Sequence, residues 1–230
     1  MRVDRFLSNL PRFNRQQVRL LLVARRVRID GLVISDPHAQ VREFSRVEVD
    51  DELLQAGRPA RYFMLHKPAG CVSATRDPQH PTVLDWLDEP DKDDLHIAGR
   101  LDFNTTGLML ITNDGSWSRR LTQPQTKLPK VYYVETEQTI TAEYAITFAR
   151  GLYFAFEDLI TQPAELTLLG PNSARLSIFE GRYHQVKRMF GHFDNKVLRL
   201  HRERMGPLSL DAELEPGQYR ALSPDEVSLI

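Results

Sequence analysis

Apolar positions in the first 24 residues follow the spacing of two short helices. The first set recurs every three or four residues and predicts an amphipathic helix; it consists of Val3, Phe6, Leu7 and Leu10. A second helix is predicted from residue 15, because Asn14 is a favourable N-cap and Gln17 follows three residues later, as in a capping box. The inward face of this helix would carry Val18, Leu21 and Leu22.

The pattern then changes to short β-prone runs. "RVRIDGLVI" places two such runs around Asp30-Gly31, which is a strong signal for a two-residue hairpin. "FSRVEVDDEL" indicates one further strand, and Gly57 and Pro59 then interrupt the pattern. We therefore expect a small helical and hairpin domain over 1–58 and a larger domain over 59–230.

The larger domain mixes strands and helices. Strands are predicted for "RYFMLHKP", "GLMLITNDG", "KVYYVETE", "PAELTLLG", "ARLSIFEG", "KVLRLHRE" and "LSLD". Helices are predicted for "SWSRRL", "TAEYAITFARG", "RYHQVKRMFGHF" and "SPDEVSLI". Because neighbouring strands are joined by short turns, we expect the α+β class with a mainly antiparallel sheet.

Composition restricts the broad class of protein. Apolar residues make up 41% and charged residues 27%, which is ordinary for a water-soluble globular chain. No apolar run is long enough to cross a bilayer, and the N-terminus has no stretch of signal-peptide length. Cys71 is the single cysteine, so an internal disulfide is excluded. These features favour a cytoplasmic protein with no membrane contact.

Positive charge is concentrated in two segments although the formal net charge is −1. Residues 1–28 hold eight arginines against Asp4, and residues 182–204 hold seven basic residues against Asp194 and Glu203. Such segments on a nearly neutral protein are typical of a polyanion-binding surface. The alternative is a solvated surface, with the first arginines paired to "EVDDE" at 48–52.

Several common catalytic motifs are missing from the sequence. It contains no GxxxxGK[ST] or GxGxxG phosphate loop, no CxxC or HExxH metal spacing, and no GxSxG nucleophile motif. We expect no metal site and no cofactor. The unusual stretch is "GRLDFNTTGLMLITNDG" at 99–115, in which Asp102 is the one acid before the turn.

Asp102 has two interpretations from the residues alone. It could cap the turn formed by the following Thr-Thr-Gly, as loop aspartates often do. Alternatively, it could carry chemistry, because Arg100 two residues earlier projects to the same side of an extended backbone. Tyr132 and Tyr133 could present an aromatic face from a nearby strand. One acid, one base and one flat ring suit chemistry at the sugar carbon of a nucleotide held by stacking.

Four motifs in series resemble the pseudouridine synthases, specifically the family of the ribosomal small subunit pseudouridine synthase A. They are "FMLHKPAG" at 63–70, "GRLDFNTTGLMLITNDG" at 99–115, "KVYYV" at 130–134 and "EGRYHQVKRMF" at 180–190. The first 58 residues resemble the S4-type RNA-binding module that precedes the catalytic domain in that family. The resemblance covers essentially the whole chain in the expected order.

The resemblance implies a reaction and a set of residue roles. The enzymes isomerise a uridine within RNA by breaking N1–C1′, turning the base and forming C5–C1′, without a cofactor. Asp102 corresponds to the essential aspartate, which acts either by covalent attack or through a glycal. Tyr132 corresponds to the tyrosine that stacks on the target base, Lys187 to the basic partner of the aspartate, and Arg100 to a residue that helps fill the space left by a flipped base.

The same resemblance implies the RNA partner. We expect 16S ribosomal RNA in a small-subunit assembly intermediate as substrate, and a monomeric enzyme. The S4-like module would contact RNA through Arg5, Arg15, Arg19, Arg25, Arg26 and Arg28. Two alternatives remain: the same chemistry on large-subunit ribosomal RNA, and a non-catalytic RNA-binding protein of the S4 type. The complete set of Arg100, Asp102, Tyr132 and Lys187 argues against the second.

Overall fold

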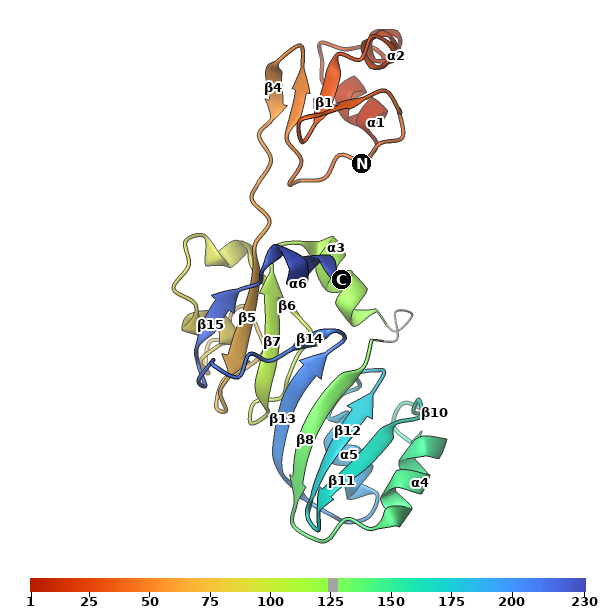
Figure 1. Cartoon of the computed structure of the whole chain (residues 1–230), viewed down its shortest axis with the longest axis vertical. Coiled ribbons are helices and arrows are strands. Elements are labelled where there is room, and N and C mark those ends of the chain that lie inside the picture. The colour runs from red at the N-terminus through yellow and green to blue at the C-terminus, as the bar shows by residue number, and fades with distance from the viewer. Residues whose placement is uncertain (124–127) are drawn as a thin grey trace. The chain divides into compact units, whose positions relative to one another are not determined.

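The computed structural model describes residues 1–123 and 128–230. The chain divides into two compact units, which we call unit 1 (Met1–Ala60) and unit 2 (Arg61–Ile230). Figure 1 shows the helices and strands of each unit. The division falls within two residues of the boundary that Gly57 and Pro59 predict.

Unit 1 has two helices and a four-stranded antiparallel sheet in the order β2-β1-β3-β4. The helices are α1 (Val3–Ser8) and α2 (Arg15–Val23). The strands are β1 (Val27–Ile29), β2 (Leu32–Ile34), β3 (Val47–Val49) and β4 (Glu52–Gln55). The predicted capping box is present, since Asn14 Oδ1 accepts from Gln17 N and Gln17 Oε1 accepts from Asn14 N.

The strands of unit 1 differ from the prediction at one point. The sequence analysis expects one strand in "FSRVEVDDEL", whereas the structure has the hairpin β3–β4. Asp50 and Asp51 turn the chain in the left-handed region, with φ of 52° and 64°. Aspartate tolerates this conformation better than most side chains, so the turn forms without glycine.

In the described part of unit 2, nine strands form one sheet whose main path is β11-β12-β8-β13-β7-β5-β15. The long strands are β5 (Tyr62–Lys67), β7 (Thr106–Thr112), β8 (Lys130–Thr136), β11 (Glu165–Gly170), β12 (Ser173–Ile178) and β13 (Val197–Met205). The short strands are β6 (His96–Ala98), β14 (Leu208–Ser209) and β15 (Tyr219–Ala221). Among these pairs only β13 and β7 run parallel, so the expected mainly antiparallel α+β fold is confirmed.

Helices cover both faces of this sheet (Figure 1). On one face α4 (Ala142–Arg150), α5 (Gln185–Gly191) and the 3₁₀ turn η1 (Val83–Trp86) enclose the larger core. On the other face α3 (Gly115–Thr122) and α6 (Pro224–Ser228) pack around Trp117. A second 3₁₀ turn, η2 (Lys92–Asp94), precedes β6, and a separate hairpin joins β9 (Tyr153–Phe154) to β10 (Leu159–Ile160).

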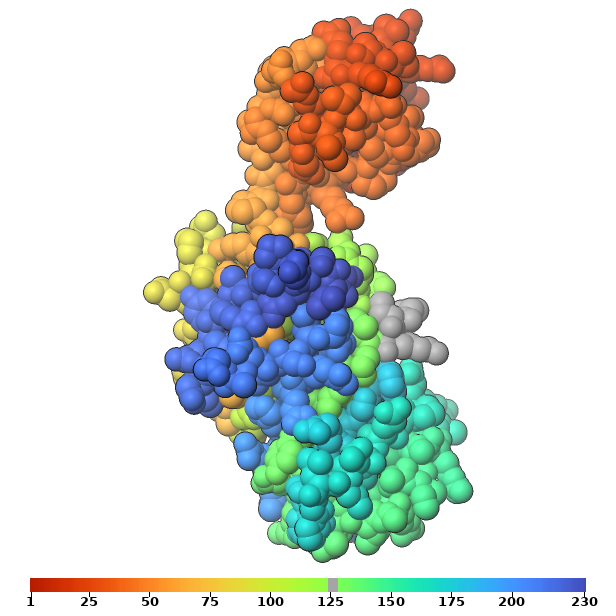
Figure 2. All heavy atoms as spheres, viewed as in Figure 1, coloured from red at the N-terminus to blue at the C-terminus, as the bar shows by residue number. Residues whose placement is uncertain are grey.

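The C-terminal segment closes one side of the sheet. On the face that Figure 2 shows, this segment, in blue, forms much of the surface of unit 2. Leu210 and Leu214 pack against the core around Trp117, and His66 Nδ1 lies 2.6 Å from Leu214 O. The C-terminal segment therefore covers part of this face of the sheet.

Candidate active site

The loop between β6 and β7 carries Asp102 and is anchored by its neighbours in the fold. Ser73 Oγ donates to Leu101 O at 2.6 Å and accepts from Leu101 N at 2.9 Å. The turn itself is closed by backbone atoms, since Thr105 N donates to Asp102 O at 3.0 Å. The Asp102 carboxylate is thus left available for other contacts, unlike the arrangement expected if it capped the turn.

Lys67 also holds the loop that carries Asp102. This lysine at the end of β5 is fully buried, and its Nζ donates to Pro68 O at 3.0 Å, Phe103 O at 3.1 Å and Thr105 O at 2.9 Å. Burial lowers the pKa of the Lys67 ammonium, although nearby Cys71 and Asp102 oppose that change. The three carbonyl acceptors compensate for part of the lost hydration, and two of them, Phe103 O and Thr105 O, tie the backbone that follows Asp102 to the end of β5.

Arg202 braces the start of the loop from β13. Its buried guanidinium donates from Nε to Leu108 O at 2.8 Å and from Nη2 to Gly99 O at 2.9 Å. The parallel pairing of β13 and β7 brings the Arg202 backbone against Gly107, where an added Cβ would lie 2.3 Å from Arg202 O. Gly107 also has φ of +107°, so both close approach and backbone conformation require glycine in "TTG".

Two basic side chains face the Asp102 carboxylate. Lys187 Nζ lies 3.3 Å from Asp102 Oδ2, and His184 Nε2 lies 3.5 Å from Asp102 Oδ1. The Asp102 side chain is 25% exposed, so it remains reachable while an ammonium and an imidazole bracket its two oxygens. An ionised carboxylate held between such groups suits nucleophilic or proton-transfer chemistry.

Asp102 opens into a pocket of about 500 Å³. Its lining joins the Asp102 loop, β8, β13 and the segment 178–186 before and within α5; the residues used below are Arg100, Asp102, Tyr132, Arg182, Tyr183 and His184. A volume of this size accommodates a nucleoside-sized ligand. The pocket therefore lies where the predicted aspartate, arginine and tyrosine meet.

Tyr132 reaches the pocket from β8. Alternation along the strand directs Tyr132, which is buried, toward the α5 side and Tyr133 toward the opposite side. Tyr133 instead donates its hydroxyl to Glu135 at 2.7 Å and lies under Arg199. Of the two tyrosines in "KVYYV", Tyr132 is thus the one placed to contact a base beside Asp102.

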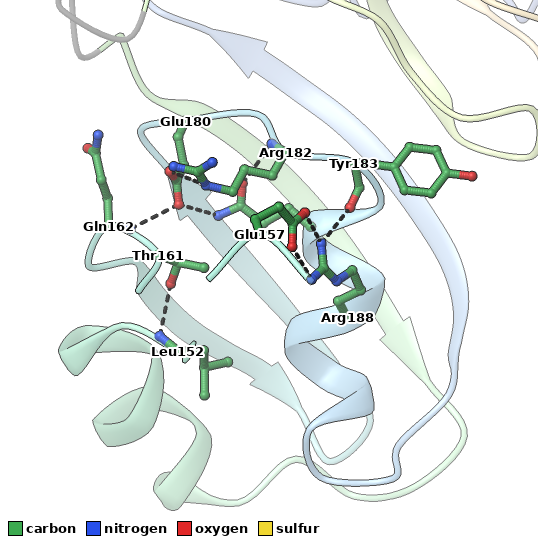
Figure 3. Close-up of polar contacts among 9 residues, drawn as sticks. Leu152, Glu157, Thr161, Gln162, Glu180, Arg182, Tyr183 and Arg188 are labelled. Atoms are coloured by element: carbon green, nitrogen blue, oxygen red, sulfur yellow. Dashed lines mark hydrogen bonds and ion pairs between the residues drawn. The ribbon is translucent and has the colours of Figure 1, made fainter. Parts of the chain in front are cut away.

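A buried carboxylate organises the segment that precedes α5 (Figure 3). Glu180 accepts from Gln162 N, Gln185 Nε2 and Arg182 Nε, each at 2.9 Å. Gln185 Oε1 in turn accepts from Arg182 N at 3.0 Å. These contacts set the start of α5, the helix that carries Lys187.

The β9–β10 hairpin supports the same helix through Arg188. Its guanidinium makes a paired contact to Glu157, at 2.6 and 2.7 Å (Figure 3). It also lies 3.7 Å from the Phe154 ring centroid. Arg188 Nη1 also donates to Tyr183 O at 3.4 Å. The side chain of Arg188 therefore links the hairpin to the segment that bears His184.

The structure brings together Arg100, Asp102, Tyr132 and Lys187, which the sequence analysis selected. Arg100 is exposed at the pocket wall, and its backbone oxygen accepts from Arg202. Sequence reasoning missed His184 and the supporting residues Lys67 and Arg202. A charged residue directly after the apolar run "FMLH" was a signal for Lys67, and His184 lies within the quoted motif "EGRYHQVKRMF".

The six arginines of unit 1 that the sequence analysis predicts to contact RNA divide into two groups. Arg26 is paired with Asp50, and Arg28 Nη1 lies 2.9 Å from Asp51 Oδ1, as the alternative of pairing with "EVDDE" supposes. The others are exposed, and the ion pairs of the described residues do not include them; they are Arg5, Arg15, Arg19 and Arg25. The second group has the freer positive charge for an external anion.

Within residues 1–123 and 128–230, no three His, Cys, Asp or Glu side chains are grouped so as to hold a metal ion. No helix there is long and apolar enough to span a membrane.

Comparison with known proteins gives matches over the whole chain. The family model described as RNA pseudouridylate synthase matches residues 61–192. "Ribosomal small subunit pseudouridine synthase A" of Pseudomonas aeruginosa is 64% identical over 227 residues, which cover 99% of each chain. The protein of the same name from Escherichia coli K12 is 43% identical over 230 residues and all of both chains.

A solved structure titled "Crystal structure of pseudouridylate synthase" aligns over 100% of both chains, with a TM-score of 0.73 and 38% identity. The fold, the pocket around Asp102 and these full-length matches lead to one assignment. The chain belongs to the RNA pseudouridylate synthase family and is an RNA pseudouridine synthase.

Proposed function

We propose that this protein converts a specific uridine of small-subunit (16S) ribosomal RNA to pseudouridine, with Asp102 acting at the ribose. The observation that carries the proposal is the Asp102 carboxylate at the pocket wall, 3.3 Å from Lys187 and 3.5 Å from His184. The names of the full-length relatives from P. aeruginosa and E. coli support the choice of RNA.

The pocket suits a nucleotide that has left its stack. Removing a base from stacked RNA costs a few kcal/mol, and stacking on an aromatic ring restores about 1–3 kcal/mol of that cost. Tyr132 supplies such a ring beside Asp102, and Arg100 at the pocket wall is placed to occupy the space left in the RNA. The base that leaves C1′ is also the one that returns, so the reaction needs no group donor, redox partner or metal.

Unit 1 would act as an S4-like RNA-binding domain, and unit 2 as the catalytic domain. Of the arginines predicted to contact RNA, those outside the ion pairs of the described residues are Arg5, Arg15, Arg19 and Arg25. The substrate would be 16S RNA in an assembly intermediate, bound by a monomer in the cytoplasm. Light scattering of the purified protein, with and without RNA, measures its molar mass and so tests whether it is a monomer.

The substrate choice is tested with purified protein and unmodified RNA. Free 16S RNA, partly assembled and complete small-subunit particles, and free 23S RNA are incubated separately, and pseudouridine is mapped at nucleotide resolution. We expect one modified uridine in 16S RNA, with faster formation in an assembly intermediate than in the complete particle. Modification of 23S RNA alone would contradict the proposed substrate and leave the chemistry in place.

A further inference from the structure

Tyr183 is an exposed aromatic residue at the mouth of the Asp102 pocket. It lines the pocket and is 70% exposed, although an aromatic ring of this size is normally covered in a folded protein. Its ring lies 3.8 Å from the His184 ring at an interplanar angle of 22°, a stacked arrangement. Among the described residues, His184 is the one aromatic ring in contact with it, so the outer face of Tyr183 is available.

The surrounding network holds Tyr183 in place. Its backbone oxygen accepts from Arg188, which is itself fixed by the paired contact to Glu157 and by the Phe154 ring. Figure 3 shows the Tyr183 ring pointing away from these contacts. A ring on a tethered backbone, already stacked on His184, loses less conformational freedom when a ligand stacks on its other face.

The same ring is connected to the reacting group. His184, stacked beneath Tyr183, places its Nε2 3.5 Å from Asp102 Oδ1. The order Tyr183, His184, Asp102 thus runs from solvent to the pocket. A ligand that orders Tyr183 also restricts the imidazole that contacts the carboxylate.

Charge around Tyr183 indicates the class of ligand. Arg182 is paired with Glu180 and Lys187 faces Asp102, whereas the ion pairs of the described residues do not include Arg100, which is exposed in the same pocket and can contact a phosphate. Every nucleobase has a face that can stack on an aromatic ring, and a flipped uridine leaves its neighbours partly unstacked. Tyr132 is already assigned to the target base, and Tyr183 lies at the rim beside it.

We propose that Tyr183 is the stacking site for a nucleobase adjacent to the target uridine, and that this base positions Asp102 through His184. Tyr183 is then a binding residue, and His184 is a positioning residue for the carboxylate. The inference rests on the proposed role of Asp102. It adds a requirement that the RNA next to the target be unpaired enough to present a base.

The test pairs changes in the protein with changes in the RNA. Full-length substrate RNA is assembled by ligation with an abasic ribose immediately 5′ or 3′ of the mapped uridine. Turnover is measured for the wild type, Tyr183→Leu, Tyr183→Phe and the matched exposed-tyrosine control Tyr153→Leu. Tyr153 is 61% exposed on the neighbouring hairpin and does not line the pocket, and circular dichroism checks that every variant is folded.

We expect Tyr183→Leu to lower kcat/KM by about 5- to 150-fold on intact RNA, the range for loss of one base–aromatic stack. Tyr183→Phe and Tyr153→Leu should stay within about twofold of the wild type. One of the abasic RNAs should cause a similar loss with the wild type and little further loss with Tyr183→Leu. Additive losses at both flanking positions would overturn the stacking site.

The proposed effect of Tyr183 on Asp102 through His184 is tested by measuring kcat and KM separately. Tyr183→Leu should lower kcat as well as raise KM, whereas in a His184→Gln background it should raise KM alone. An unchanged kcat for Tyr183→Leu in the wild-type background would overturn the positioning role. An active Asp102→Asn variant would instead refute the proposed function, so the two failures are distinguishable.

Discussion

Replacing Lys67 by methionine should destabilise unit 2 and slow the reaction, although Lys67 does not line the pocket. Lys67 is fully buried and donates to two carbonyl oxygens of the Asp102 loop, Phe103 O and Thr105 O, and to Pro68 O. Methionine has a similar length and cannot donate, so the change removes these hydrogen bonds with little change in volume.

The magnitude follows from the three contacts. A hydrogen bond from a charged group contributes about 1.5–3 kcal/mol. Two features make the loss smaller than the sum of three such bonds. The variant no longer has to bury an ammonium, and Phe103 O still accepts from Gly70 N at 3.0 Å. We therefore expect the free energy of unfolding to fall by about 2–4 kcal/mol, which is in the range for breaking a buried polar network.

The effect on rate has a different cause. Without Lys67, the backbone that follows Asp102 loses the hydrogen bonds at Phe103 O and Thr105 O, and a displacement of about 1 Å in a catalytic group costs about 100-fold in rate. We expect kcat to fall at least about tenfold at a temperature where the variant is still folded. KM for RNA should change little.

Urea unfolding followed by tryptophan fluorescence measures the stability. Both tryptophans, Trp86 and Trp117, lie in unit 2, so the signal reports on that unit. Lys92→Met is the matched control, because Lys92 Nζ makes one hydrogen bond to a carbonyl, at 3.2 Å, and should cost about 1 kcal/mol or less. A Lys67→Met enzyme with wild-type stability and kcat would refute the positioning of the loop by this ammonium.

Three other predictions concern separate parts of the chain. Tyr132→Ala should lower kcat/KM far more than Tyr132→Phe, because stacking needs the ring; equal losses would exclude stacking as its main role. RNA affinity should fall as salt rises. The slope of log affinity against log salt concentration should flatten more in Arg15→Gln/Arg19→Gln/Arg25→Gln than in Arg26→Gln/Arg28→Gln, and equal slopes would contradict the division of these arginines into two groups. The hydrogen bond from Arg220 holds the pKa of Glu226 at about 2, below its usual 4.5, so Glu226→Gln should lower the Tm at pH 7. That difference should shrink as the pH falls from 4.5 toward 2, where the wild-type carboxylate also becomes protonated, and a constant difference in Tm would refute the ion pair as its cause.

The residues that the sequence could identify are those with a local signal. The α2 capping box at Asn14, the hairpin at Asp30-Gly31 and the strand that carries Tyr132 follow from spacing alone. The predicted helix over 182–193 is shorter, at Gln185–Gly191, because His184 adopts φ of 49° and the segment before it is tied to Glu180.

The rest depends on which strands become neighbours. Periodicity indicates a strand around Arg202 but not that β13 inserts between β8 and β7. That insertion places Arg202 beneath Gly99 and forms the back of the pocket. Lys67 likewise acquires its role from carbonyls more than 30 residues away in the chain.

The most direct test of the account is the activity of Asp102→Asn measured together with its affinity for RNA. The substitution keeps the size of the side chain and removes the negative charge that Lys187 and His184 face. We predict no pseudouridine above background in single-turnover assays with 16S RNA, and an RNA affinity within about threefold of the wild type, since most binding energy comes from phosphate contacts elsewhere. Product formation within about tenfold of the wild-type rate would contradict the central claim that the Asp102 carboxylate performs the reaction.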